Sequence, residues 1–302
     1  MISIQSFQKL SKRFFYHCAI ACLPILIILS GVYPAFGQAQ NDKADKTANA
    51  QADNAVEQEK AEEAAEARQR FFRSNQADPA YEFQTVAGDH LSVEGFKRYG
   101  LPLENKALQK YINTVGATLA RNSKQSNNPC YFTVIKNPSY LSWACPGGVV
   151  VVSSGLLKVM EDESELACVL AREIAHLSRK DLLRTLGRIK DLKKESYEGV
   201  IKNMAATLFE TGFSQETEFA ADAFGMEIAY KTGYDPAGYI RVLERLEAEK
   251  SRGSQKEGWF ATHPPVSSQI KNSKKILLKY PDHSEMARVS KRFSDYKGMI
   301  PE

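Results

Sequence analysis

The stretch Arg172-Glu173-Ile174-Ala175-His176 decides how this sequence is interpreted. It matches the pattern H-E-x-x-H at every position but the first; in that pattern, two histidines on one face of a helix bind zinc and the glutamate activates a metal-bound water. Position 172, where the pattern has its first histidine, is an arginine. A guanidinium is protonated at every working pH and offers only donors, so Arg172 cannot ligate a cation. The stretch therefore predicts a metal-binding helix that lacks one ligand.

Apolar residues at helical spacing predict three long helices in the central part of the chain. These helices cover residues 104–121, 161–178 and 216–230, and the middle one contains the Arg172–His176 stretch. The third helix is followed by a glycine and an Asp-Pro pair, which are typical signals for the end of a helix. We therefore expect helices to dominate the fold.

Short runs rich in β-branched and aromatic residues precede the central helix. Residues 130–135 and 141–145 flank a turn at Pro138, so we expect them to pair as an antiparallel hairpin. Residues 149–153 have the composition of a further, buried strand. The expected fold class is α+β, mainly helical with a small antiparallel sheet.

The predicted hairpin places Cys130 opposite Cys145. In an oxidising compartment the two are candidates for a disulfide, and a pair of buried thiols is the alternative. Cys168, four residues before Arg172, is expected to be a small buried apolar group.

The N-terminus has the pattern of an export signal. Basic residues between positions 9 and 13 precede an apolar run over residues 18–32, and small residues follow. This run is shorter than the roughly 20 residues that span a bilayer as a helix. We therefore expect a signal peptide over residues 1–38 and export to the periplasm or cell envelope, with an uncleaved anchor as the alternative.

Composition divides the rest of the chain. Residues 39–75 are rich in Ala, Glu and Lys and cannot bury a core, so they are predicted to form a tether, either disordered or a solvated single helix. A folded domain is expected over residues 76–288, followed by a C-terminal tail over 289–302. The basic segment 181–194 is interpreted as a solvated helix face, with contact to an anionic membrane as the alternative. A net charge of +4 on 302 residues gives no reason to expect nucleic acid as a partner.

Several segments together resemble the gluzincin family of zinc metallopeptidases, which includes the CAAX prenyl protease and HtpX. The resemblance rests on ACPGGVVVVSSGLL, ESELACVLAREIAH, TGFSQETEFAADAFG and THPP, in that order. The chain looks most like exported members of the BepA and LoiP type. The resemblance implies a zincin-like metallopeptidase fold, zinc as cofactor, and protein quality control in the cell envelope, at or near the membrane periphery. Its partners would be extended or unfolded polypeptides.

The resemblance also implies roles for individual residues. His176 matches the second histidine ligand of the family, Glu218 the glutamate ligand and Glu173 the general base. Asp222 matches a carboxylate that supports the ligands. His263, in THPP, matches a histidine that approaches the metal in some members.

The resemblance further implies a substrate-binding edge strand. In the family, an extended substrate adds to this strand by backbone hydrogen bonding. The matching residues are Leu141, Ser142, Trp143, Ala144 and Cys145. The family often has Asn-Ala where this chain has Leu-Ser, so the strand departs from the family pattern at its start.

Arg172 leaves two interpretations open. In the first, His176, Glu218 and His263 hold zinc, and the protein is an active metalloendopeptidase with Glu173 as its base. In the second, the guanidinium pairs with the carboxylates that zinc would neutralise, and the protein is a pseudoprotease that binds its clients. A unit charge about 4 Å from zinc costs roughly 4 kcal/mol per unit of metal charge at an effective dielectric of 20, which favours the second interpretation.

Overall fold

The computed structural model describes residues 79–124, 128–187, 196–251 and 258–301. The predicted signal peptide and tether, residues 1–38 and 39–75, lie outside the described residues, as does part of the basic segment 181–194. Apart from the first turn of α3, the elements below belong to one unit, Phe83–Glu302. Within the described ranges, every helix is too short or too polar to cross a membrane.

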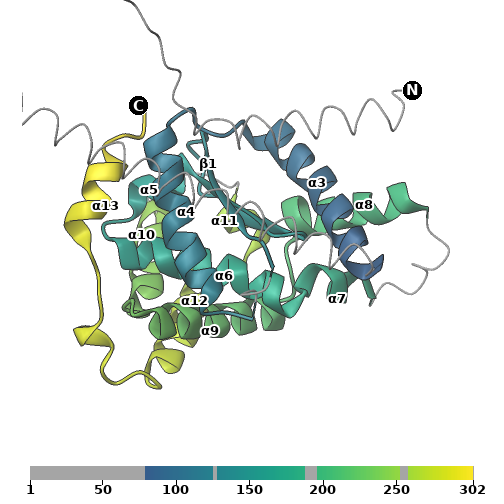
Figure 1. The fold of residues 1–302 in the computed structure, drawn as a ribbon. Helices are drawn as coiled ribbons and strands as arrows, with labels where there is room; N and C mark the ends of the chain where they lie inside the picture. The colour runs from purple at the N-terminus through teal and green to yellow at the C-terminus, as the bar shows by residue number, and fades with distance from the viewer. Residues whose placement is uncertain (1–78, 125–127, 188–195, 252–257, 302) are drawn as a thin grey trace, which may run out of the picture. The chain divides into compact units, whose positions relative to one another are not determined.

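Helices make up most of this unit, so the predicted mainly helical α+β class is confirmed. Helices α4, α6 and α9 correspond to the three long helices expected from apolar spacing (Figure 1). The helices are α3 (Pro79–Tyr99), α4 (Lys106–Arg121), α5 (Ser154–Val159), α6 (Glu163–Arg179), α7 (Asp181–Gly187), α8 (Tyr197–Ala206), the π-helix η2 (Thr207–Thr211), α9 (Gln215–Thr232), α10 (Ala237–Ser251), α11 (Trp259–Thr262), α12 (Val266–Leu277), the 3-10 helix η3 (His283–Glu285) and α13 (Ser290–Lys297).

Local sequence signals set the ends of the two helices that carry the site. At the start of α6, Asp162 Oδ1 accepts a hydrogen bond from Glu165 N at 3.1 Å, and Ser214 caps α9 in the same way. Gly233 ends α9 in the left-handed conformation, with φ 98°. Short-range contacts therefore define both ends of α9 and the start of α6.

The sheet is mixed, and its strand order differs from the predicted hairpin. Its strands are β1 (Tyr131–Ile135), β2 (Ser142–Cys145) and β3 (Val149–Ser153), in the order β1-β3-β2. β3 pairs parallel with β1 and antiparallel with β2, so the expected pairing of residues 130–135 with 141–145 is wrong. The physical reason is the valine run of β3, which is buried on both faces and therefore takes the central position.

The corrected strand order separates the two candidate disulfide partners. Cys130 precedes β1 and Cys145 ends β2, so β3 lies between their strands. Strands two positions apart are about 9–10 Å from each other, whereas a disulfide needs Cα atoms within about 7 Å. Both cysteines are free thiols, so the predicted disulfide is not formed. Burial raises the pKa of each thiol to about 12.

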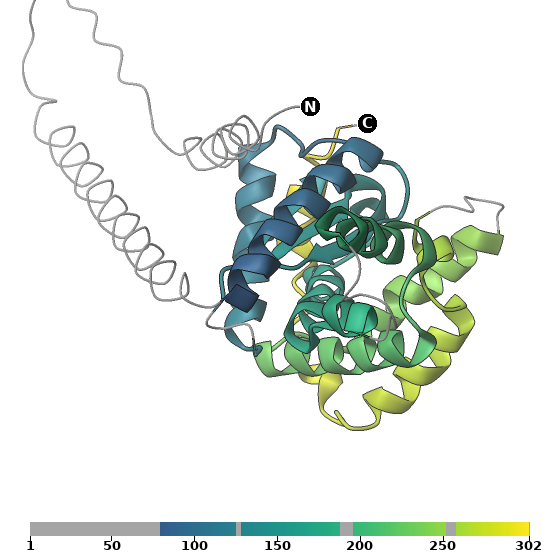
Figure 2. The same ribbon diagram turned by 90° about the vertical axis from the view of Figure 1, so that its right-hand side faces the viewer.

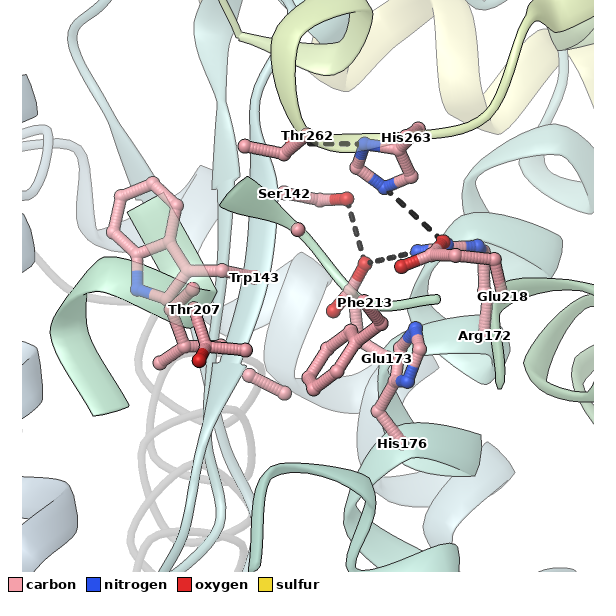
Figure 3. A pocket seen from close by; sticks show the side chains of 13 residues that line it. Ser142, Trp143, Arg172, Glu173, His176, Thr207, Phe213, Glu218, Thr262 and His263 are labelled. Carbon is pink, nitrogen blue, oxygen red and sulfur yellow. Dashed lines mark hydrogen bonds and ion pairs between the residues drawn. The ribbon is translucent and has the colours of Figure 1, made fainter. Parts of the chain in front are cut away.

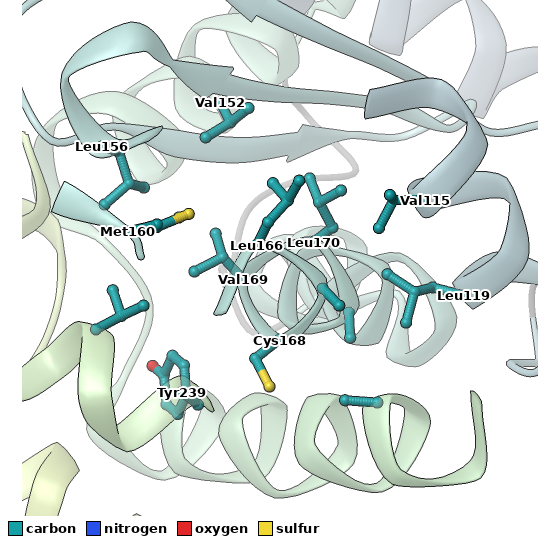
Figure 4. Close-up of a cluster of buried hydrophobic side chains, with 14 of the residues drawn as sticks. Val115, Leu119, Val152, Leu156, Met160, Leu166, Cys168, Val169, Leu170 and Tyr239 are labelled. Atoms are coloured by element: carbon teal, nitrogen blue, oxygen red, sulfur yellow. The ribbon is translucent and has the colours of Figure 1, made fainter. Parts of the chain in front are cut away.

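Helix α6 lies at the centre of the fold, with elements packed on both of its sides. Leu166 and Leu170 of α6 point toward the sheet and α4, whereas Cys168 points to the opposite side of α6 (Figure 4), where its Sγ lies 3.6 Å from the carbonyl oxygen of Asp235. Cys168 is buried, as predicted. The opposite face of the sheet is covered by residues of α3, α7, α8 and η2 (Figures 1 and 2). Because α6 is enclosed, its polar residues are buried together with its apolar ones.

Helix α13, near the end of the described residues, packs against α4 and α6. Phe293 of α13 is buried, and the ring of Tyr296 stacks on that of Tyr111 in α4 with centroids 4.1 Å apart. Arg292 forms an ion pair with Glu163 at the start of α6. Within residues 289–302, helix α13 thus joins α4 to α6.

Candidate active site with an arginine at its centre

Helices α6 and α9 approach each other most closely at a glycine. A Cβ atom added to Gly225 of α9 would lie 2.8 Å from both Cα and N of Arg172, so a side chain at this position would separate the helices. Glu218 and Asp222 lie on the same face of α9, one helical turn apart. The close approach brings both carboxylates to Arg172.

The guanidinium of Arg172 is bonded to carboxylates through all three of its nitrogens (Figure 3). Nε donates to Asp222 Oδ1 at 2.9 Å, Nη1 donates to Glu173 Oε1 at 3.1 Å, and Nη2 donates to Glu218 Oε2. The residue is 1 % exposed. Burial alone would lower the pKa of Arg172, but Glu218 and the other acidic neighbours hold it well above its ordinary value. Arg172 is therefore a permanent buried cation shared by three carboxylates.

A second layer of buried polar groups holds Asp222 in place. The Tyr239 hydroxyl donates to Asp222 Oδ1 at 2.6 Å. Gln269 Nε2 donates to the Tyr239 hydroxyl oxygen at 3.1 Å, and Gln269 Oε1 accepts from Trp259 Nε1 at 3.1 Å. These contacts join α9, α10, α12 and α11, so the arginine cluster is tied to four helices. Sequence analysis did not identify Tyr239 or Gln269 as part of the site.

Strand β2 is connected to the cluster through Glu173. The Ser142 hydroxyl donates to Glu173 Oε1 at 2.8 Å, the same oxygen that accepts from Arg172 (Figure 3). The predicted general base therefore faces the predicted substrate strand, with one of its two oxygens engaged.

His176 is held by an aspartate that the sequence analysis did not identify. Its Nδ1 lies 2.9 Å from Asp181 Oδ2, and its ring stacks on Phe213 with centroids 4.8 Å apart. Arg179 Nε donates to the same Asp181 oxygen at 3.1 Å. Asp222, which the resemblance suggested as the supporting carboxylate, bonds to Arg172 and Tyr239 instead.

His263 faces the cluster from the turn after α11. Its ring stacks on Trp259 with centroids 4.1 Å apart, and its Nε2 lies 3.9 Å from Glu218 Oε2. Burial, together with the charge of Arg172, places the pKa of His263 well below its ordinary value. His263 is therefore neutral at neutral pH. Burial also raises the pKa of Glu218, against the opposite effect of Arg172.

These side chains surround an open pocket of about 340 Å³ of empty space, part of it continuous with solvent. Leu141, Cys145 and Asp222 are not among the lining residues, although sequence analysis placed them in the site. The predicted residues that line it are Ser142, Trp143, Ala144, Arg172, Glu173, His176, Glu218 and His263. Its other lining residues, which sequence analysis missed, are Thr207, Leu208, Gly212, Phe213 and Thr262.

The side chains present do not fit a zinc ion in this arrangement. Among the described residues, no group of three or more His, Cys, Asp or Glu side chains is placed to hold a metal ion. Glu218, which was expected to ligate zinc, is bonded through Oε2 to Arg172 instead. The chemistry that this geometry itself supports is the pairing of charges and the binding of a polar or extended ligand in the pocket.

Comparison with known proteins identifies the ancestry of this arrangement. The sequence profile of Peptidase family M48 matches residues 106–277, more than half of the chain. The chain belongs to peptidase family M48. The matched range of this metallopeptidase family contains Arg172, Glu218 and His263, and the predicted resemblance is confirmed.

Several curated M48-type relatives are similar to the chain over part of their length. The β-barrel assembly-enhancing protease of Escherichia coli (strain K12) is 28% identical over 232 residues, which is 67% of this chain and 47% of that protein. Its counterpart in Yersinia pestis is 27% identical over 186 residues, 55% of this chain and 38% of that protein. The mitochondrial metalloendopeptidase OMA1 of Schizosaccharomyces pombe is 26% identical over 195 residues, 61% of this chain and 56% of that protein. The chain thus spans about half the length of these relatives, or less.

Proposed function

We propose that this protein is a zinc-free member of peptidase family M48 that binds extended or unfolded polypeptides in the cell envelope without hydrolysing them. The observation that carries the proposal is the guanidinium of Arg172, which is buried and bonded to Glu173, Glu218 and Asp222. These are the carboxylates that a metal ion would otherwise neutralise. Hydrolysis by this family depends on a metal-activated water, so an arginine in this position favours binding without cleavage.

The proposal that a polypeptide still binds rests on the pocket and on β2. The pocket lies along β2, whose outer edge can pair with an extended chain through backbone hydrogen bonds. The Ser142–Glu173 hydrogen bond fixes this strand to α6. A preformed strand edge beside an open pocket can receive a polypeptide whether or not a metal is bound.

The proposed location has two supports. The first is the export pattern at the N-terminus of the sequence. The second is the similarity to proteins named β-barrel assembly-enhancing proteases. A role in envelope protein quality control at the membrane periphery, with unfolded or misassembled proteins as clients, follows from the same two supports.

The decisive experiment measures the zinc content and the activity of the purified protein. Mature protein produced in zinc-supplemented medium is analysed by mass spectrometry for bound metal, and is then incubated with unfolded casein with and without a chelator. We expect far less than one zinc per chain, no chelator-sensitive cleavage, and binding of unfolded casein. One tightly bound zinc per chain with chelator-sensitive cleavage would instead establish the active metalloendopeptidase, with His176, Glu218 and His263 as ligands and Glu173 as general base.

A further inference from the structure

Strand β2 presents part of its backbone to the pocket. On its inner side, Ser153 N donates to Leu141 O at 2.9 Å, and every second residue of β2 repeats this orientation in the antiparallel ladder with β3. The peptide groups of Ser142 and Ala144 therefore point away from β3. Both residues line the pocket, so their outward N–H and C=O groups can pair with an incoming chain.

One end of this backbone edge is already occupied. Tyr140 is the next outward-facing residue before Ser142, and its carbonyl accepts from Trp259 N at 2.8 Å. Gly212 and Thr262 both line the pocket, and a Cβ on Gly212 would be 1.8 Å from the Thr262 carbonyl oxygen. A chain paired with β2 cannot continue past Ser142 along the strand. Trp259, at the start of α11, and Gly212, after η2, occupy the space that it would need. The pocket thus receives the end of a chain.

Three acceptor atoms of residues that line the pocket are not used within the protein. Among the described residues, Glu173 Oε2, Glu218 Oε1 and His176 Nε2 have no hydrogen-bond partner. Glu173, Glu218 and His176 are 2 %, 1 % and 7 % exposed, and Figure 3 shows their side chains around the same space. One guanidinium faces three carboxylates here, which leaves excess negative charge. The pocket therefore favours a small cation with several donors and no acceptor.

We infer that this pocket binds the free amino terminus of an extended polypeptide, with its ammonium group among Glu173, Glu218 and His176. An ammonium group has three donors and no acceptor, which matches the three unused atoms. The first residues of the ligand pair with Ser142 and Ala144, and the bound chain runs parallel to β2, away from Trp259. A carboxyl terminus would be repelled by the same charge. This inference rests on the proposed function, since it names the part of a client that the protein holds.

The test compares the two ends of one peptide. A short synthetic peptide rich in valine and threonine carries a fluorophore near its carboxyl end and is prepared with a free or an acetylated amino terminus, and with a carboxylate or an amide at the other end. Fluorescence anisotropy with the purified mature protein measures binding. We expect acetylation to weaken binding by at least about tenfold, because charged hydrogen bonds are lost. Amidation of the carboxyl end should change binding by less than about twofold.

Each outcome of this comparison decides something. Equal binding of the free and acetylated forms would overturn the inference and leave the proposed binding of polypeptides intact. Binding that is lost on amidation of the carboxyl end would assign the opposite terminus and also overturn it. If none of the four forms binds, both this inference and the proposed function fail.

Two pairs of variants test the geometry. Ala144→Pro removes an outward N–H that β3 does not use, and should abolish peptide binding, whereas Ala144→Gly keeps the N–H and should retain it. Glu218→Gln should reduce the ratio of affinities between the free and acetylated peptides, a ratio that partial loss of folded protein does not change. Glu216→Gln, at an exposed position on the same helix, is the matched control. If Glu218→Gln leaves the ratio of the two affinities unchanged, the ammonium group does not bind at Glu218 and the inference is overturned.

Discussion

Arg172 Nε donates to Asp222 Oδ1 at 2.9 Å and thereby joins α6 to α9. Both partners are almost completely buried. The energetic weight of such a pair is best judged by what remains when one partner is removed, since a buried charge without a partner is far costlier than a buried pair. Arg172 is therefore both a structural residue and the residue that distinguishes the two functional interpretations.

Replacing Arg172 by methionine should destabilise the fold strongly. The variant would leave Glu173, Glu218 and Asp222 buried without a cation, and we expect a loss of about 3–5 kcal/mol in the free energy of unfolding. Urea denaturation of the purified protein measures it. Arg184→Met, at an exposed position on α7, should change stability by less than about 0.5 kcal/mol. Similar effects of the two substitutions would contradict the role assigned to the cluster.

Replacing Arg172 by histidine restores the metal motif and removes the internal cation. We expect the variant to bind zinc and to be stabilised by it, by about 3 kcal/mol when free zinc is a hundredfold above its Kd. Thermal unfolding with and without zinc, together with metal analysis, checks this. A folded variant that gains no stability from zinc would show that the site has lost more than one ligand, with Leu141-Ser142 the next positions to restore.

Replacing Gly225 by alanine should destabilise the protein, although alanine is normally the better helix former. The added Cβ would lie 2.8 Å from backbone atoms of Arg172, which cannot move without shifting α6 against α9. We expect a loss of about 1–3 kcal/mol in thermal or urea unfolding. Gly298→Ala, where a Cβ meets its nearest neighbours at 3.5 Å, is the control and should be nearly neutral. A stabilised Gly225→Ala variant would show that the two helices have room to separate.

Asp89 of α3 should make stability depend on pH. Burial raises its pKa from 3.8 to about 6, so the folded state favours the neutral carboxyl. The stability that this carboxyl contributes is present below pH 3.8 and is lost as the pH rises through about 6. The free energy of unfolding of Asp89→Asn should therefore rise relative to that of the natural protein as the pH increases from 3.8 to 6. Above pH 6 the variant should stay more stable by roughly 1–2 kcal/mol, a value reduced for solvent screening. Urea titrations at pH 5 and pH 8 check this, and a difference that does not grow with pH would refute it.

The cysteines should be free but protected. Three cysteines lie among the described residues: Cys145 and Cys168 are buried and Cys130 is partly buried, and burial raises the pKa of each thiol. We expect slow alkylation in the folded protein and rapid alkylation of all three in urea without reductant. Mass spectrometry counts the modified residues. A Cys130–Cys145 pair that resists alkylation until it is reduced would contradict the strand order described above.

The parts of the fold that sequence predicted are those set by short-range patterns. Helices α4, α6 and α9 follow from apolar spacing, and the end of α9 follows from Gly233. The strand order did not follow, because the turn at Pro138 suggested a hairpin while the doubly buried valines of β3 place that strand between the other two. The strand order depends on which faces of the sheet are covered by helices distant in sequence. The turn at Pro138 carries no information on this covering.

The site divides in the same way. Arg172, Glu173 and His176 were recognisable from the spacing of the family motif, and Glu218 from a second segment of the resemblance. Asp181, Tyr239 and Gln269 were not, since each reaches the cluster only through tertiary packing, and an aspartate at the start of a helix or a tyrosine within one is ordinary in sequence. The pairing of Arg172 with three carboxylates could be anticipated from charge. It could not be anticipated that Asp222 bonds to Arg172 and Tyr239 and does not support a histidine.

The bonds from Arg172 to both α6 and α9 have a consequence for how the protein matures. A metal ion has to be delivered to a newly folded chain, whereas an arginine is synthesised with it. The carboxylates of Glu173, Glu218 and Asp222 find their counter-charge as soon as the two helices meet. If the protein is zinc-free, as proposed, completion of this core needs no loading step and is independent of the supply of metal in the compartment where the chain folds.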